Sequence, residues 1–240
     1  MNRHQTHKVP QSEEVPVPTR PLAVAFDVLE TLLDLQPLHD RFAEIGQPTE
    51  LLQPWFLRVQ RDCMALTLSG DVGEFYPAAR QALRTESGQS VTEEQIDHVL
   101  EAFGALPAHP DAGPAMRRLA AAGVRVGCLT VGSPDTTAQF LQQAGLAQHV
   151  EQVVTTQQVG TWKPAPAVYH FTAEAFGVPM HRLALVAVHA WDCHGAKRAG
   201  CLAGWCARLE GAYGDVFTPP DVTGDDLEQV AEGLLALPED

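Results

Sequence analysis

The sequence predicts an α/β protein with a parallel sheet and one all-helical insertion. Short apolar, strand-like runs alternate with helical segments from residue 109 onward. Residues 36–108 show helical spacing without strand-like alternation, and four strand-like runs end at polar residues. Strands that alternate with helices imply a parallel sheet joined by right-handed crossovers.

Length and charge narrow the class of protein. The 240 residues suit one domain, or a core with one insertion, that can bury a substantial interior. Sixteen Lys and Arg against 30 Asp and Glu give a net charge of −14. This charge favours solubility and disfavours nucleic acid or an anionic membrane as a partner. No stretch is long and apolar enough to span a membrane, and we expect residues 1–20 to be a disordered lead-in.

The cysteines predict a reducing environment. There are five of them, an odd number, and none forms a Cys-x-x-Cys pair or a recognisable metal-ligand spacing. We therefore expect a cytoplasmic protein with no disulfide framework and no metal site.

The first predicted strand, residues 22–26, ends at Asp27, and the helical insertion follows it. Thr92 and Gln95 fit a capping box ahead of the last helix of the insertion. Apolar residues at helical spacing mark one face in each of two helices: Trp55, Val59, Cys63 and Leu66, and Ile96, Val99, Leu100 and Phe103.

After a turn-rich linker at residues 104–111, strands and helices alternate. Helices are expected at residues 112–122, 134–143, 164–176 and 192–199, and strands at 124–129, 153–155, 183–188 and 201–207.

Polar side chains follow four of the predicted strands. Asp27 follows the first, Thr130 the second, Lys163 the third after a short loop, and His189 and Asp192 the fourth. Ligands of an open parallel sheet bind outside the carboxyl ends of its strands. These groups therefore predict one pocket that holds two carboxylates, a hydroxyl, a lysine and a histidine.

Four motifs carry a resemblance to a known family: Phe26-Asp27-x-x-x-Thr31-Leu32, Leu129-Thr130, Lys163-Pro164-x-Pro166-x-x-Tyr169 and His189-Ala190-Trp191-Asp192. Together they resemble the haloacid dehalogenase superfamily and, within it, the 2-haloacid dehalogenases. The resemblance implies a Rossmann-like core at residues 21–35 and 109–240, with a helical cap at 36–108. It also implies a small anionic 2-haloacid as substrate, no cofactor and a homodimer.

For Asp27 the resemblance implies covalent catalysis. The carboxylate would displace halide from carbon and form an ester, which water then hydrolyses. Superfamily phosphatases carry a second Asp two residues after the nucleophile, where this chain has Leu29. Leucine cannot protonate a leaving alcohol, whereas halide needs no proton. Lys163 would supply fixed positive charge beside Asp27 and Asp192 without Mg²⁺.

The chain departs from well-known members where they bind halide. Val131 replaces an Asn, and Phe56 stands where a cap Arg is expected, with Arg58 nearby. We therefore expect the halide site to be built differently. The candidate substrate-binding residues are Thr130, Leu29, Val131, Tyr169, Phe56, Arg58 and Trp191.

Two further departures occur as a pair. Glu30 replaces a Gly of the first motif and His189 replaces an Asn of the fourth. A branch of the family looks similar in both respects and uses the pair to activate the hydrolytic water, because a carboxylate that accepts an imidazole N–H raises the basicity of the other nitrogen. Asp192 would then orient Lys163 and the water.

Two other functions stay open at this point. One is phosphatase-like hydrolysis of a small phosphorylated metabolite, which Leu29 disfavours. The other is a turnover-deficient binding protein, which the retention of Asp27, Lys163 and Asp192 disfavours.

Overall fold

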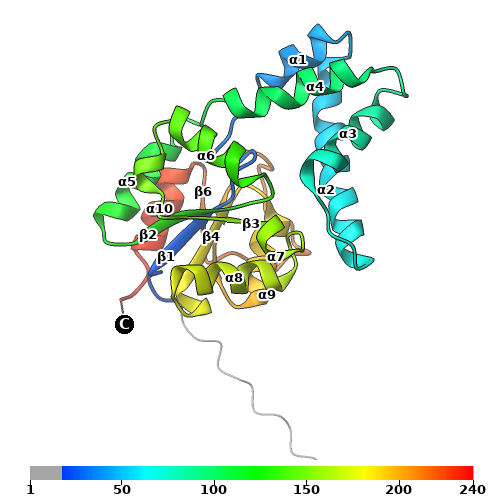
Figure 1. Ribbon diagram of the computed structural model, residues 1–240. Coiled ribbons are helices and arrows are strands. Elements are labelled where there is room, and N and C mark those ends of the chain that lie inside the picture. Colours follow the sequence, from blue (N-terminus) through cyan, green and yellow to red (C-terminus); the bar gives the residue numbers. More distant parts are fainter. Residues whose placement is uncertain (1–17, 240) are drawn as a thin grey trace, which may run out of the picture.

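A computed structural model describes residues 18–239. Its centre is a six-stranded parallel sheet in the order β3-β2-β1-β4-β5-β6, so the expected α/β class is confirmed (Figure 1). The strands are β1 (Ala23–Phe26), β2 (Arg125–Thr130), β3 (Gln152–Thr155), β4 (Leu183–Ala187), β5 (Leu202–Cys206) and β6 (Val222–Gly224).

Strand β1 lies in the middle of the sheet and is buried along its whole length. It pairs with β2 on one side and β4 on the other, with Phe26 opposite Cys128 and Val186. A strand buried on both faces needs a continuous apolar run, and Ala-Val-Ala-Phe provides it. The strand order reverses at β1, so Asp27 leaves the sheet at the topological switch point, where α/β folds bind ligands.

Helices cover both faces of the sheet (Figure 1). Alternate residues of β1 point to opposite faces: Val24 and Phe26 pack with α5, α6 and α10, whereas Ala23 and Ala25 pack with α8 and α9. These helices are α5 (Ala112–Ala121), α6 (Pro134–Gln143), α8 (Pro166–Phe176), α9 (Ala190–Ala199) and α10 (Leu227–Leu235).

The insertion after β1 is helical, as expected, and forms the upper right part of Figure 1. It contains α1 (Leu38–Glu44), α2 (Leu52–Leu68), α3 (Phe75–Glu86) and α4 (Glu93–Glu101), which we call the cap. Thr92 and Gln95 form the predicted capping box at the start of α4. Trp55, Phe42, Phe75 and Phe103 form an aromatic cluster that holds these helices together.

The two segments that join cap and core run side by side. The Asp34 N–H donates to the Pro107 carbonyl at 2.9 Å, and the His109 N–H donates to Leu32 at 2.8 Å. Because both crossings are tied together, the chain passes between core and cap at one place, directly after the loop that carries Asp27 and Glu30.

Three elements were not expected from the sequence: α7 (Thr156–Val159), β6 and α10. The first two are only four and three residues long, and β6 is a partly exposed edge strand without an apolar run. The start of α10 was recognisable, because Asp226 caps it by accepting from the Gln229 N–H. Most of the expected lead-in, residues 1–17, lies outside the described residues. Among the described residues, no helix is long and apolar enough to cross a membrane.

Candidate active site

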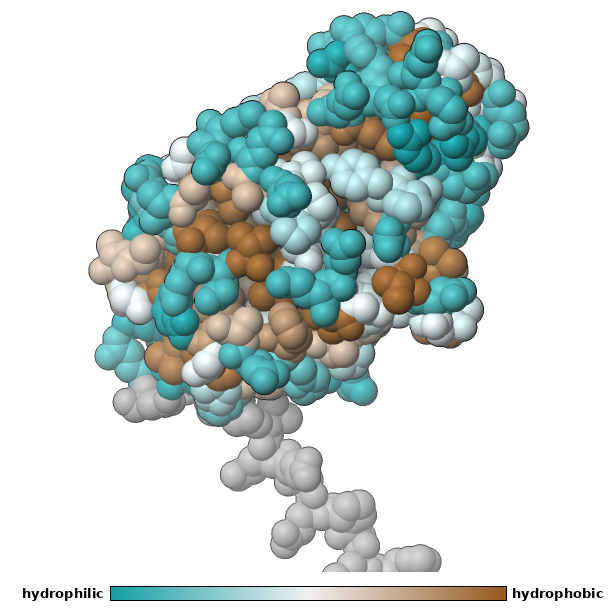
Figure 2. All heavy atoms as spheres, in the orientation of Figure 1, coloured by the Kyte–Doolittle hydropathy of each residue, from teal (hydrophilic) through white to brown (hydrophobic). Residues whose placement is uncertain are grey.

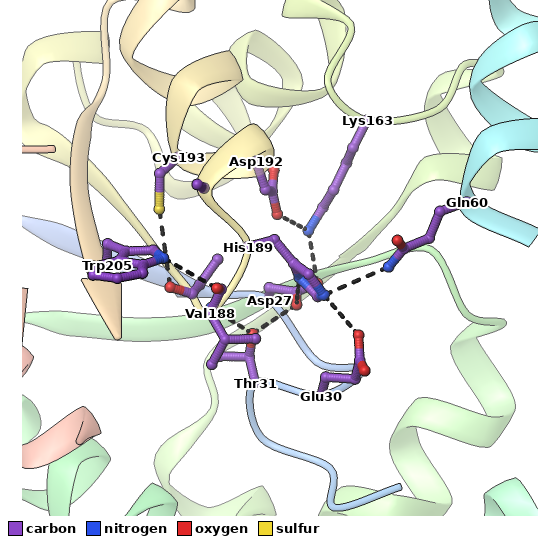
Figure 3. A network of polar contacts seen from close by, with 12 residues as sticks. Asp27, Glu30, Thr31, Gln60, Lys163, Val188, His189, Asp192, Cys193 and Trp205 are labelled. Carbon is purple, nitrogen blue, oxygen red and sulfur yellow. Dashed lines mark hydrogen bonds and ion pairs between the residues drawn. The ribbon is translucent and has the colours of Figure 1, made fainter. Parts of the chain in front are cut away.

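Asp27 is the centre of the site (Figure 3). It follows β1 directly and is 4% exposed. Lys163 Nζ donates to its Oδ1 at 2.9 Å, and the Thr31 hydroxyl donates to its Oδ2 at 2.7 Å. The Thr31 oxygen also accepts the Val188 N–H at 3.1 Å, which ties the loop after β1 to the end of β4. One carboxylate is therefore fixed by a cation on one oxygen and a hydroxyl on the other.

Lys163 is fully buried between two carboxylates. Its Nζ lies 2.7 Å from Asp192 Oδ2, in addition to its contact with Asp27. The Tyr169 hydroxyl donates to the other Asp192 oxygen at 2.6 Å. Buried charges need such pairing, because an unpaired ion in the interior costs several kcal/mol. Asp192 and Tyr169 thus hold the ammonium in place against Asp27.

The ionisation of this group follows from its charges. Burial would raise the pKa of Asp27, but the Lys163 ammonium and His189 outweigh it and hold that pKa well below its ordinary value. Burial would lower the pKa of Lys163, but Asp192 and Asp27 raise it above its ordinary value. Burial raises the pKa of Asp192, and Lys163 only partly opposes this. At neutral pH Asp27 is therefore a carboxylate beside an ammonium.

His189 bridges Asp27 and Glu30, the pair expected from the sequence. Its Nε2 lies 2.8 Å from Glu30 Oε2, and its Nδ1 lies 3.3 Å from Asp27 Oδ2. The Nδ1 contact is an ion pair without hydrogen-bond geometry. The imidazole therefore presents one nitrogen to Glu30 and the other to Asp27.

The backbone of Glu30 is unusual for a residue with a side chain. Its φ is +64°, in the left-handed region that favours glycine. A non-glycine residue there costs about 1 kcal/mol. The 2-haloacid dehalogenases that this sequence resembles have glycine at this position, which adopts such a φ without strain. In this chain the residue is Glu30, whose backbone is less favourable there but whose carboxylate reaches His189.

The two carboxylates decide the charge of His189. Burial lowers the pKa of the imidazole, but close contact with the negative charges of Asp27 and Glu30 raises it to about 10. The free protein at neutral pH therefore holds an imidazolium between two carboxylates. Neutralising Asp27 removes one of the two groups that keep this proton bound.

A small closed pocket adjoins Asp27. Its volume is about 10 Å³, room for one water molecule. The Trp191 ring lies against the imidazole of His189, with ring centroids 5.3 Å apart. The core and the cap both supply the walls: Asp27, Leu29, Val131, Trp162, His189 and Trp191, with Phe56, Val59, Gln60 and Phe75.

Phe56 of α2 separates this pocket from open space. It also lines an outer groove of about 610 Å³, together with Glu30, His39 and Arg208. Among the described residues, Phe56 is the only side chain that lines both hollows. Movement of this ring would connect the buried pocket to the groove.

Three candidate substrate-binding residues have other contacts. The Thr130 oxygen accepts the Gly132 N–H at 3.0 Å, and the hydroxyl on Asp27 belongs to Thr31 instead. Tyr169 bonds to Asp192 and does not line the pocket. Arg58 pairs with Glu86 within the cap, away from the pocket lining, so it is not the missing cap arginine.

Sequence reasoning missed Gln60 and Trp162. Val59 and Gln60 follow Phe56 by three and four residues, so all three lie on the side of α2 that meets the pocket. Its amide lies 3.5 Å from His189 Nε2, a nitrogen already paired with Glu30 (Figure 3). For Gln60, the sequence offered one indication, a polar residue beside the apolar face of a predicted helix. For Trp162 it offered only the position directly before Lys163.

Comparison with known proteins agrees with this geometry. The sequence model of the haloacid dehalogenase-like hydrolase family matches residues 21–200. An (S)-2-haloacid dehalogenase of Pseudomonas putida is 25% identical over 217 residues, which span 88% of this chain and 96% of that protein. Haloacetate dehalogenase H-2 of Moraxella sp. (strain B) is 26% identical over 220 residues, 90% of this chain and 98% of that protein.

Solved structures give the same fold. The crystal structure of an L-2-haloacid dehalogenase superposes with a TM-score of 0.83 at 26% identity, covering 91% of this chain and all of that one. The family model spans most of the chain, and three of the four motifs contribute side chains to one site, the buried Asp27 carboxylate with Thr31, Lys163 and His189. The chain therefore belongs to the haloacid dehalogenase-like hydrolases.

Proposed function

We propose that this protein is a hydrolytic dehalogenase that converts a small 2-haloalkanoic acid to the 2-hydroxy acid through an ester on Asp27. The observation that carries this proposal is the Asp27 carboxylate, buried and ionised in an apolar pocket between Lys163 and Thr31. The relatives named for 2-haloacid and haloacetate dehalogenation support it.

In the first step an Asp27 oxygen attacks the carbon that bears the halogen. The new C–O bond forms as the C–halogen bond breaks, and the electron pair leaves with the halide. An ionised carboxylate needs no base for this reaction. Lys163 keeps Asp27 ionised and oriented. One such displacement inverts the substrate carbon, and the relatives named for the (S) enantiomer favour the same preference here.

In the second step His189 acts as the base. Once Asp27 is esterified it is neutral, so the carboxylate facing Nδ1 no longer holds the imidazole proton, which passes to solvent. Neutral His189, with its Nε2–H donated to Glu30, then takes a proton from water. The hydroxide adds to the ester carbonyl, the bond between the Asp27 carbonyl carbon and the ester oxygen breaks, and the hydroxy acid leaves with the proton from His189. The Asp27 acid then gives its proton to Nδ1, which restores the carboxylate and the imidazolium.

The two alternative functions each meet an obstacle in the site. Phosphate ester hydrolysis needs an acid for the leaving alcohol, and Leu29 lines the pocket instead. A protein without turnover would have no use for the strained backbone that brings Glu30 to His189.

Assembly and compartment are part of the proposal. We propose a homodimer whose interface buries the apolar residues at the C-terminal end of α2. Leu66, Leu68 and Val72 are 37%, 89% and 51% exposed there (Figure 2). Light scattering of the full chain and of Leu68→Glu tests this. The five cysteines are all free and buried, which fits the reducing cytoplasm that we propose as its location.

A halide-release screen tests the proposed function. Chloro-, bromo- and fluoroacetate and both enantiomers of 2-chloropropionate are offered with EDTA, and p-nitrophenyl phosphate is offered with and without Mg²⁺. We expect halide release that EDTA does not diminish, because the Lys163 ammonium already neutralises Asp27. Asp27→Asn is the matched control and should release none. Activity on the phosphate ester alone, dependent on Mg²⁺, would refute the proposal.

A further inference from the structure

The departing halide needs a hydrogen-bond donor in a pocket that lacks the family's usual ones. Val131 offers no side-chain N–H, Phe56 replaces the cap arginine, and Arg58 is paired with Glu86. Halide expelled into an apolar pocket without a donor would be a desolvated anion, which is costly. Another group beside Asp27 must therefore stabilise it.

Trp162 has such a donor. The residue lines the pocket and is 1% exposed, and its indole Nε1 is buried without an acceptor among the described residues. The other buried tryptophans are satisfied: Trp55 donates to the Ala79 carbonyl at 2.9 Å and Trp205 to the Val188 carbonyl at 3.1 Å. Native proteins rarely leave a buried donor unpaired, so this N–H is available to an acceptor that enters the pocket.

The position of Trp162 fits this task. It directly precedes Lys163, whose ammonium contacts Asp27. Its backbone N–H donates to the Thr67 hydroxyl of α2 at 3.2 Å, which fixes the residue between core and cap. The Gln60 amide lines the same pocket from α2. Because its neighbour, His189 Nε2, is already paired with Glu30, that amide keeps donors for a ligand.

We propose that the indole N–H of Trp162 is the principal donor to the departing halide, with the Gln60 amide as a second donor. This inference rests on the proposed function. As Asp27 forms its C–O bond, the halide leaves with the electron pair of the broken bond and accepts the indole N–H. The indole proton stays on its nitrogen throughout.

Trp162→Phe tests the proposal, because it removes the N–H and keeps an aromatic ring. Trp55→Phe is the matched control, since it removes a buried indole N–H that has an acceptor. Halide release is measured with bromo-, chloro- and fluoroacetate, and bromide binding by NMR line broadening, which needs no turnover. Thermal unfolding is followed for both variants.

For Trp162→Phe we expect a loss in halide release of roughly tenfold or more, growing from bromo- to fluoroacetate as the leaving group worsens. Bromide broadening should weaken. Both variants lose buried ring volume, so the melting temperature should fall less in Trp162→Phe than in Trp55→Phe, where the Ala79 carbonyl also loses its donor. Trp55→Phe should lower the melting temperature and leave bromide binding unchanged.

Two outcomes would overturn the proposal: unchanged bromide binding in Trp162→Phe, or an equal loss for all three haloacetates accompanied by a fall in melting temperature as large as that of Trp55→Phe. Failure of the proposed function looks different. The parent protein would then release no halide from any haloacid, whatever the bromide measurement shows.

Discussion

Replacing His189 by glutamine should remove a pH dependence from the stability of the free protein. His189 is buried between Asp27 and Glu30, and its pKa of about 10 compares with an ordinary value of 6.5. A pKa raised by folding stabilises the folded state fully below the unfolded value. That contribution is lost as the pH rises from 6.5 toward 10.

The size of the effect follows from the shift. Each pH unit well inside this window costs about 1.4 kcal/mol, and less near pH 6.5, where the unfolded imidazole is only half titrated. The parent should therefore lose roughly 2 kcal/mol between about pH 6.5 and pH 8.5. Thiols begin to add to this loss near the upper limit, because burial raises the pKa of Cys63, Cys128 and Cys201 to about 12 whereas ordinary thiols ionise near pH 8.5. They do so equally in the parent and in His189→Gln, so their contribution cancels in the difference between the two proteins.

Urea unfolding at a series of pH values measures this dependence. The difference between the parent and His189→Gln isolates the imidazole, and His181→Gln, which removes an exposed histidine, is the control. We expect the parent and the control to lose stability across the window and His189→Gln to stay nearly level. Equal slopes in the parent and His189→Gln would show that His189 is not held as an imidazolium.

Two further changes test the site. Lys163→Met should abolish halide release and destabilise the protein by about 3–5 kcal/mol, because Asp27 and Asp192 lose their shared buried cation. Urea unfolding of Lys163→Met should show that its stability recovers at low pH, where Asp27 and Asp192 are protonated. Halide release at the parental rate by Lys163→Met would contradict this role of Lys163. Phe56→Ala should join the pocket to the groove and raise the relative activity on 2-halobutyrate over haloacetate, at a stability cost of about 3–5 kcal/mol. Leu52→Ala, which lines the groove alone, should keep the parental preference, and an unchanged preference in Phe56→Ala would exclude the ring as the barrier.

The polar groups of the site were predictable because the fold brings strand ends together. Asp27 and His189 follow neighbouring strands, and the alternation of strands and helices was enough to place them at one edge. Glu30 and His189 were expected as a pair because both replace family residues, and the structure brings them within 2.8 Å. The catalytic role of that pair stays a prediction.

The remaining contacts depend on packing that the sequence does not specify. Thr31 lies in the loop after β1 and Thr130 is the last residue of β2, and only the path of the first loop decides that Thr31 reaches Asp27. Gln60 belongs to the site because of the way the cap sits on the core. The unpaired N–H of Trp162 becomes visible only when every neighbour of the indole is known.

The most direct test of the two-step mechanism is a single experiment with His189→Gln and bromoacetate. Rapid quenching measures bromide per site, and intact-protein and peptide mass spectrometry locate any modification. We predict about one equivalent of bromide, then arrest, with a carboxymethyl ester on Asp27, because displacement needs no base and hydrolysis does. Continued turnover at the parental rate, or no bromide from the folded variant, would contradict the assignment of His189 as the base.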